Sequence, residues 1–127
     1  MLDPLTDDVI AELAGSDAVY YLASPYSLYA GGLDAAALVA CRAAAALLSR
    51  HVSLFSPIAH DHPVAEAGGL DQRDHEFWMK HCRRRMEKMD GLIVVQAPGW
   101  QTSRGVAEEI AFFRESCLPI YGMPHVA

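Results

Sequence analysis

The stretch "MDGLIVVQAPGWQTSRGVAEEIAFFRE", residues 89–115, decides the fold of this chain. Its first part, "GLIVVQA" (91–97), is a nearly unbroken run of apolar and β-branched residues, which is typical of a strand buried on both faces. "PGWQT" follows as a loop, and Thr102 or Ser103 is placed to cap a helix that continues to about residue 116. A buried strand, a short loop and a helix in this order predict a right-handed βαβ unit in a parallel sheet.

The segments on the N-terminal side repeat this alternation of strand and helix. After a short acidic lead-in, we predict strands over residues 17–24 and 52–56, and Asp34 is placed to cap an alanine-rich helix over 35–51. That helix carries apolar residues at helical spacing, namely Leu38, Cys41, Ala45 and Leu48. Residues 57–69 are interpreted as a long loop, 72–89 as a helix and 118–122 as a short last strand.

This order predicts one domain over residues 1–127 with a three-layer α/β/α sandwich, flavodoxin-like or Rossmann-like, around a parallel sheet of about four to five strands. In such folds ligands bind at the carboxyl ends of the strands. The loops that begin there contain many Ser, Tyr, His and Gly residues: "SPYSLYAGG" (24–32), "SPIAHDHP" (56–63) and "PGWQTSRG" (98–105). We therefore expect the chemistry of the protein in these loops.

Composition narrows the class of protein. Hydrophobic residues make up 52% of the chain, which is enough for a core, and the net charge of −6 argues against a nucleic-acid binder. The longest apolar run is too short for a membrane span, the first residues are acidic where a signal peptide is basic, and the three cysteines form no CxxC pair. We expect a cytoplasmic protein with neither nucleic acid nor membrane as a partner. The basic cluster Arg83–Arg85 has three possible roles: a patch that attracts phosphate, an interface, or a solvated face. We favour the solvated face, in which Glu76 and Glu87 pair with the arginines.

The two adjacent acids of the last helix are not equivalent. Helical geometry aligns an apolar stripe that must pack on the sheet, formed by Val106, Ile110, Phe113 and Cys117. Glu108 lies opposite this stripe and is expected in solvent, whereas Glu109 lies on its flank and leans toward the strand-end crevice. The alternative is that both glutamates are surface residues whose negative charge interacts favourably with the helix dipole. Gly105 in the first turn lets a ligand approach the backbone, and the free N–H groups there favour a phosphate or another anion.

Three segments together carry a resemblance to a known superfamily. "VYYLASPYS" (19–27), "SPIAH" (56–60) and "MDGLIVV…PGWQTSRGVAEEI" (89–110) resemble the nucleoside 2-deoxyribosyltransferase-like superfamily. The pattern PGW..S.GV..EI is most similar to its small DUF1937-type and DUF4406-type members. The S-x-G-V-x-x-E spacing, from Ser103 to Glu109, is also similar to that of 2'-deoxynucleoside 5'-monophosphate N-glycosidases. The resemblance covers roughly residues 17 to 122.

The resemblance implies roles for individual residues. Glu109 matches the nucleophile that attacks the anomeric carbon and holds the sugar as a covalent ester, and Tyr21 matches a tyrosine that positions it. Ser103 stands where the hydrolases have a phosphate-contacting serine and the transferases an aspartate, which favours a nucleotide. The loop from Ser24 to Gly32 matches the sugar- or phosphate-binding loop, so we expect substrate contacts from Ser24, Pro25, Ser27 and Gly31.

The general acid of the superfamily has no clear counterpart. The aspartate expected on the helix before Asp90 is missing from "WMKHCRRRMEKMD", where His81 or Cys82 is near the expected place. His81 is our candidate proton donor, and Asp74 is the alternative from a turn earlier. If neither donates a proton, the activity is lost or changed.

Other features have two interpretations each. His60, His62, His75 and His81 are weak as a metal cluster, because H-x-H without a second defined pair is not a metal motif. We expect no metal or other cofactor. The loop that contains His60 either lines the pocket or is a solvated turn, and we select His60 as a substrate-binding residue. Trp100 either stacks a nucleobase or packs in the core or an interface, and we select it as a substrate-binding residue. For Trp78 we favour packing in the core or an interface over stacking on a nucleobase.

The resemblance implies a homodimer or larger homo-oligomer and a small-molecule nucleotide or nucleoside as substrate. The expected activity is N-glycosidic bond cleavage, by hydrolysis or by transfer of the sugar. The alternative is a nucleotide-binding or sensing module of the same fold that has lost catalysis.

Overall fold

The computed structural model describes residues 2–126 and contains five helices and five strands within them. In chain order these are β1 (Asp3–Pro4), α1 (Asp7–Ala14), β2 (Val19–Ala23), α2 (Leu33–Leu48), β3 (Ser53–Phe55), α3 (Pro57–Gly68), α4 (His75–Met86), β4 (Gly91–Gln96), α5 (Arg104–Glu115) and β5 (Ile120–Pro124). None of the helices described between residues 2 and 126 is long and apolar enough to cross a membrane.

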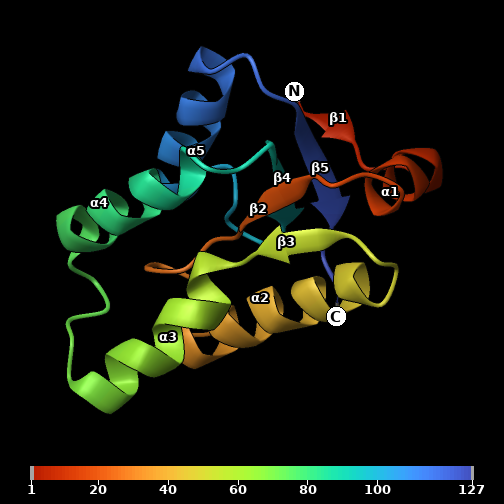
Figure 1. Cartoon of the computed structure of the whole chain (residues 1–127). Coiled ribbons are helices and arrows are strands. Elements are labelled where there is room, and N and C mark those ends of the chain that lie inside the picture. The colour runs from red at the N-terminus through yellow and green to blue at the C-terminus, as the bar shows by residue number, and fades with distance from the viewer. Residues whose placement is uncertain (1, 127) are drawn as a thin grey trace.

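All strand pairs of the single sheet are parallel, in the order β1-β5-β4-β2-β3 (Figure 1). From β2 the chain crosses to β3 on one side and then to β4 on the other, so the strand order reverses between β2 and β4. Flavodoxin-like folds have the same reversal, and their ligands bind beside it, at the carboxyl ends of the strands. The fold class predicted from the sequence is confirmed.

Two hydrophobic clusters fill the space on the two faces of the sheet. Successive residues of a strand point to opposite faces, so Tyr20 and Leu22 belong to the cluster beneath α1 and α2, whereas Tyr21 and Ala23 belong to the cluster beneath α4 and α5. Figure 1 shows α2 on one side of the sheet and α4 and α5 on the other. This is the three-layer arrangement, and it brings Tyr21 under α5.

Two segments predicted as irregular are regular in the structure. The acidic lead-in contains β1 and α1, with Thr6 accepting a hydrogen bond from the N–H of Val9 at the start of the helix. The predicted loop 57–69 is α3, which begins with Ser56 as N-cap and Pro57 in the first turn and ends at Gly69, whose φ is 67°. Serine and proline at a start and glycine at a stop are helix signals, and the internal Pro63 obscured them.

The alanine-rich helix begins earlier and faces the other way. It starts at Leu33 after Gly32, and Asp34 lies in its first turn instead of capping it. Leu38 and Leu48 are 49% and 55% exposed, and the buried face consists mainly of small residues, namely Ala36, Ala37, Val39, Ala40, Ala43, Ala44 and Leu47. Alanines let the helix backbone approach the sheet closely, which leucines on that face would prevent.

The last helix follows the predicted stripe only in part. Val106 and Phe113 are buried, and Ile110 packs against their cluster. Cys117 is exposed and lies outside the helix, which ends at Glu115. The φ angle of Cys117 is 56°. The remaining strands and helices lie within a few residues of their predicted positions.

Candidate functional site

The start of α5 is built by Ser103 and Gly105. Ser103, not Thr102, is the N-cap: its Oγ accepts a hydrogen bond from the N–H of Val106 at 3.3 Å. A Cβ added to Gly105 would meet no described atom within 4 Å. The first turn of α5 therefore faces open space, where its free N–H groups favour an anion.

That open space is a cavity of about 100 Å³, which we call the inner cavity. It lies where β2, β3 and β4 end and is bounded by the helices α3, α4 and α5. Its lining includes Ser24, Asp61, His75, Cys82, Ser103 and Glu109. The chain thus has a pocket at the edge of the sheet that the strand order favours.

Glu109 is the acid that enters this cavity. Its side chain is buried, with 6% of the residue exposed, and burial raises its pKa to about 8. The nearby Tyr21 hydroxyl opposes this rise and the negative charge of Glu108 adds to it. A pKa of about 8 means that the carboxyl group is mostly protonated at neutral pH when the cavity is empty.

Tyr21 and Cys82 surround Glu109. Tyr21 is completely buried, and burial together with the neighbouring Glu109 raises its pKa well above the usual value. Burial also raises the pKa of the Cys82 thiol to about 11. Although the Tyr21 hydroxyl is near both groups, it meets neither in standard hydrogen-bond geometry. The three groups form a cluster that is mostly uncharged at neutral pH.

Two buried hydroxyl groups of this region have no hydrogen-bond partner among residues 2–126, Tyr21 Oη and Ser24 Oγ. Ser24 is only 4% exposed and lines the inner cavity. A buried polar group without a partner is energetically costly and rare. A polar ligand in the cavity would supply the missing partner for Ser24.

A second cavity of about 420 Å³, the outer cavity, adjoins the first. The two share the lining residues Tyr26, Ser27, His75, Ser103 and Gly105. The outer cavity adds Arg73 and Arg104, while the inner cavity holds Glu109. A ligand that spans both has its reactive part beside a carboxyl group and its other end beside two guanidinium groups.

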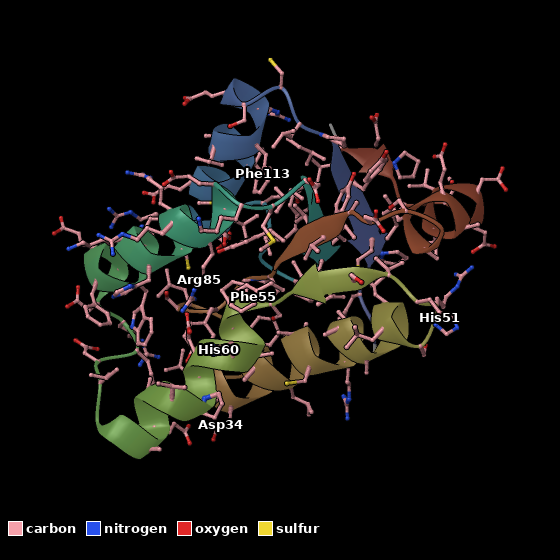
Figure 2. All side chains as sticks on the ribbon, viewed as in Figure 1. Asp34, His51, Phe55, His60, Arg85 and Phe113 are labelled. Carbon is pink, nitrogen blue, oxygen red and sulfur yellow. The ribbon has the colours of Figure 1, made fainter. Side chains whose placement is uncertain are left out.

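A buried ion pair joins α3 and α4 beside the inner cavity. Arg85 donates two hydrogen bonds to the carboxylate of Asp61, at 2.6 and 3.0 Å. The guanidinium carbon of Arg85 also lies 5.0 Å from the ring centroid of Phe55, and Figure 2 shows the two side chains between α3 and α4. The expectation of a solvated face for Arg83–Arg85 is therefore wrong at Arg85, because α3 supplies a carboxylate that the predicted loop did not.

Glu108 is also less exposed than expected. Its carboxylate accepts a hydrogen bond from His75 Nε2 at 2.8 Å and lies 3.4 Å from Arg104 Nε. The Glu108 side chain is 37% exposed and that of His75 is 20% exposed. Glu108 thus holds an imidazole that lines both cavities.

The structure brings together most of the residues selected from the sequence. Ser24, Ser103, Gly105 and Glu109 line the inner cavity, with Tyr21 against Glu109. Ser27 lines both cavities and Pro25 the outer one.

Four selected residues lie outside the lining of both cavities. His60 is exposed and pairs with Asp61 at 2.8 Å, and the ring centroids of His81 and Phe77 are 4.9 Å apart. Trp100 packs against the core on the α5 side, and Gly31 lies beside Tyr29. Asp74, the alternative proton donor, caps α4 by accepting a hydrogen bond from the N–H of Phe77.

Several lining residues were not selected from the sequence. Trp78 was expected in the core, yet its ring lines the inner cavity while its Nε1 donates to the carbonyl of Asp71 at 2.8 Å. Asp61 and His62 come from α3, which was predicted as a loop. His75 was considered only as a metal ligand. The start at Ser56 and Pro57 and the stop at Gly69 are the signals that would have placed Asp61 and His62 on a helix.

One cluster has the donor set for a divalent cation. Asp34, His62 and Glu66 each offer one ligand atom, and these atoms lie within 4.8 Å of one another. His62 Nε2 is 2.9 Å from Asp34 Oδ1 and 3.0 Å from Glu66 Oε1, and its Nδ1 is 2.6 Å from the Tyr26 hydroxyl. The Nε2–H of His62 lies within hydrogen-bond distance of both carboxylates. Hydrogen bonds therefore account for the arrangement as well as a metal ion would.

Comparison with known protein families assigns the chain to a family. Residues 18–124 match the family described as "Domain of unknown function (DUF1937)". The chain belongs to the DUF1937 family. The DUF1937 match includes all residues that line the two cavities and leaves out β1 and α1. A comparison with curated proteins gave no match.

Proposed function

We propose that this DUF1937 protein cleaves the N-glycosidic bond of a nucleotide or nucleoside, and that it belongs to the nucleoside 2-deoxyribosyltransferase-like superfamily. The observation that carries the proposal is the position of Glu109. It is a buried carboxyl group in a cavity at the carboxyl edge of the sheet, next to the Tyr21 hydroxyl and the open first turn of α5. The motif that suggested a nucleophile from the sequence thus lies in a pocket.

The proposed reaction has two steps. A carboxylate oxygen of Glu109 attacks the anomeric carbon, the bond from that carbon to the base breaks, and its electron pair leaves with the base nitrogen, which takes up a proton. Water then attacks the same carbon as it gives up one proton to a general base, and this step releases the sugar and the Glu109 carboxylate. A second base in place of water makes the reaction a transfer.

Attack requires the ionised form of Glu109. Because burial raises the pKa of Glu109 to about 8, the fraction of free enzyme that is competent increases as the pH increases toward 8. A cationic or polar substrate group that enters the cavity favours the carboxylate. Ionisation of Glu109 by itself is therefore expected to increase the base-release rate at low substrate concentration between pH 6 and pH 8, while deprotonation of the group that protonates the base opposes this increase.

The outer cavity supports a phosphorylated substrate. Arg73 and Arg104 line it, and the N-terminus of α5 opens into it through Ser103 and Gly105. Guanidinium groups and free helix N–H groups are common partners of phosphate. A nucleoside 5'-monophosphate would place its sugar at Glu109 and its phosphate in the outer cavity.

The second candidate is a binding module without catalysis. The same raised pKa favours it, because a carboxyl group that stays protonated in the complex is no nucleophile. Such a module would bind a nucleotide in the same two cavities and release no base. The proposal also includes a cytoplasmic location, a homo-oligomeric state and catalysis without a cofactor.

Base release from a panel of nucleosides and 5'-monophosphates, followed by chromatography, tests the proposal. The wild-type protein is compared with Glu109→Gln and with Glu115→Gln, an exposed acid on the same helix, with and without a second base. We expect release that Glu109→Gln abolishes and Glu115→Gln leaves unchanged. Monophosphate binding without release at enzyme concentrations that would reveal one turnover supports the binding module.

A further inference from the structure

The proposed cleavage needs a proton donor for the departing base, and this requirement selects a residue on α4. A base that leaves as an anion is a poor leaving group, so a positioned acid accelerates the step by about 10²–10⁴-fold. The donor must reach the inner cavity that holds Glu109. His81, the candidate from the sequence, packs against Phe77 and is not among the lining residues.

Most titratable side chains that line the inner cavity are already engaged. The Asp61 carboxylate accepts both hydrogen bonds from Arg85. His62 has Nδ1 on the Tyr26 hydroxyl and Nε2 between Asp34 and Glu66. The Cys82 thiol is buried, and its raised pKa makes it a weak acid.

His75 remains, and its surroundings suit a proton donor. It is the first residue of α4, and it lines both the inner and the outer cavity. Its Nε2–H donates to Glu108 Oε2 at 2.8 Å, and Arg104 holds the other carboxylate oxygen of Glu108 at 3.4 Å. A carboxylate on one ring nitrogen fixes the tautomer and the ring orientation, which leaves Nδ1 as the nitrogen that exchanges a proton. Nδ1 has no hydrogen bond to any of residues 2–126.

We infer that His75 is the catalytic acid of the proposed reaction and that Glu108 is its positioning residue. This inference rests on the proposed function. In the first step the imidazolium Nδ1–H gives its proton to the base nitrogen as the bond to the anomeric carbon breaks and its electron pair stays on that nitrogen. In the second step neutral Nδ1 takes a proton from the water that attacks the glycosyl ester of Glu109, which restores the imidazolium and the carboxylate.

The inference gives both adjacent acids of α5 a function. Glu109 acts on the sugar, and Glu108, one residue away, holds the group that acts on the base. The chain lacks the aspartate that was expected near the end of the helix before β4. His75 supplies an acid on the same helix, α4, at its first residue.

Leaving-group dependence tests the inference. The wild-type protein, His75→Gln, Glu108→Gln and the control His81→Gln are compared on 5'-monophosphates of one base class, whose rings carry progressively more electron-withdrawing substituents. Such substituents lower the need for a proton on the departing base. We expect His75→Gln to slow release of the poorest leaving base by at least about 100-fold and that of the best by less than about 5-fold. Glu108→Gln should show a smaller loss with the same trend, and His81→Gln should resemble the wild type.

The outcomes separate the inference from the function on which it rests. Release by the wild type that His75→Gln leaves unchanged, or slows equally for every base, overturns the assignment of the acid. Retained turnover of the best leaving base by His75→Gln shows that the variant is folded. No release by the wild type from any member of the series contradicts the proposed function itself.

Discussion

At the scale of single residues, Glu108 and Glu109 show how one position along a helix changes the chemistry of a side chain. Glu108 reaches the surface between α4 and α5 and is held by His75 and Arg104. Glu109 lines the inner cavity, and burial of its side chain raises its pKa to about 8. Glu109 is therefore mostly neutral in the folded protein at neutral pH. Its raised pKa can be tested by measuring the free energy of unfolding at several pH values, without a substrate.

The pH dependence of stability should change in Glu109→Gln. The pKa of Glu109 is about 8 in the folded protein and 4.5 when unperturbed, so the folded state binds the proton more tightly. Below the unperturbed pKa both states are protonated and there is no penalty, whereas above it the wild type loses stability until the pH reaches about 8. The neutral amide avoids this loss, so we expect Glu109→Gln to be more stable by up to about 3 kcal/mol at pH 7 and equally stable near pH 4.

Urea unfolding at pH 4, 7 and 9 measures this difference, with Glu115→Gln as the control that should show no such trend. A Glu109→Gln protein that is less stable than the wild type at pH 9 would mean that the carboxylate is stabilised in the folded state.

The proposed role of Ser103 in anion binding can be separated from its role as the N-cap of α5. Aspartate caps helices as well as serine, so we expect Ser103→Asp to keep stability within about 0.5 kcal/mol, whereas Ser103→Ala loses about 1 kcal/mol. The added charge should weaken binding of a nucleoside 5'-monophosphate at least 10-fold in calorimetry and affect the matching nucleoside much less. Equal affinities of Ser103→Asp and the wild type for the monophosphate would contradict phosphate binding at the N-terminus of α5.

At the scale of secondary structure, α3 is the element that completes the site. Its Asp61 joins α4 through Arg85, and its His62 lines the inner cavity. The sequence contains the start and stop signals of this helix, but Pro63 in its interior opposes a helix when local propensity alone is considered. Packing of α3 against α2 and β2 outweighs that propensity.

The Asp61–Arg85 pair should contribute measurably to stability. Its side chains are 12% and 27% exposed, so removal of the carboxylate leaves a largely buried guanidinium without its partner. We expect Asp61→Ala to lower the free energy of unfolding by about 2–4 kcal/mol. The surface pair of Asp7 and Arg50, 88% and 48% exposed, is the matched control, and Asp7→Ala should cost about 1 kcal/mol or less. Equal losses in the two variants would contradict a special role for the buried pair.

At the scale of the whole molecule, the sequence predicts the layers and the edge of the sheet where the site lies. Runs such as "GLIVVQA" predict central strands, because a central strand of a parallel sheet is buried on both faces. The S-x-G-V-x-x-E spacing, through the resemblance that it carries, selects Glu109 as the candidate nucleophile. The sequence does not predict that His75 meets Glu108 or that Asp61 meets Arg85. Those pairs are 33 and 24 residues apart, and they depend on how α3, α4 and α5 pack.

The most direct test of the central claim is the mass of the protein after reaction with a substrate that carries fluorine on the carbon next to the anomeric centre. Fluorine destabilises the oxocarbenium-like transition states of both steps, so a glycosyl-enzyme ester persists long enough to be detected. We predict that the wild-type protein gains the mass of one sugar or sugar phosphate, on the peptide that contains Glu109, and that Glu109→Gln gains none. An adduct on another residue, or base release by Glu109→Gln at the wild-type rate, would contradict the assignment of Glu109 as the nucleophile.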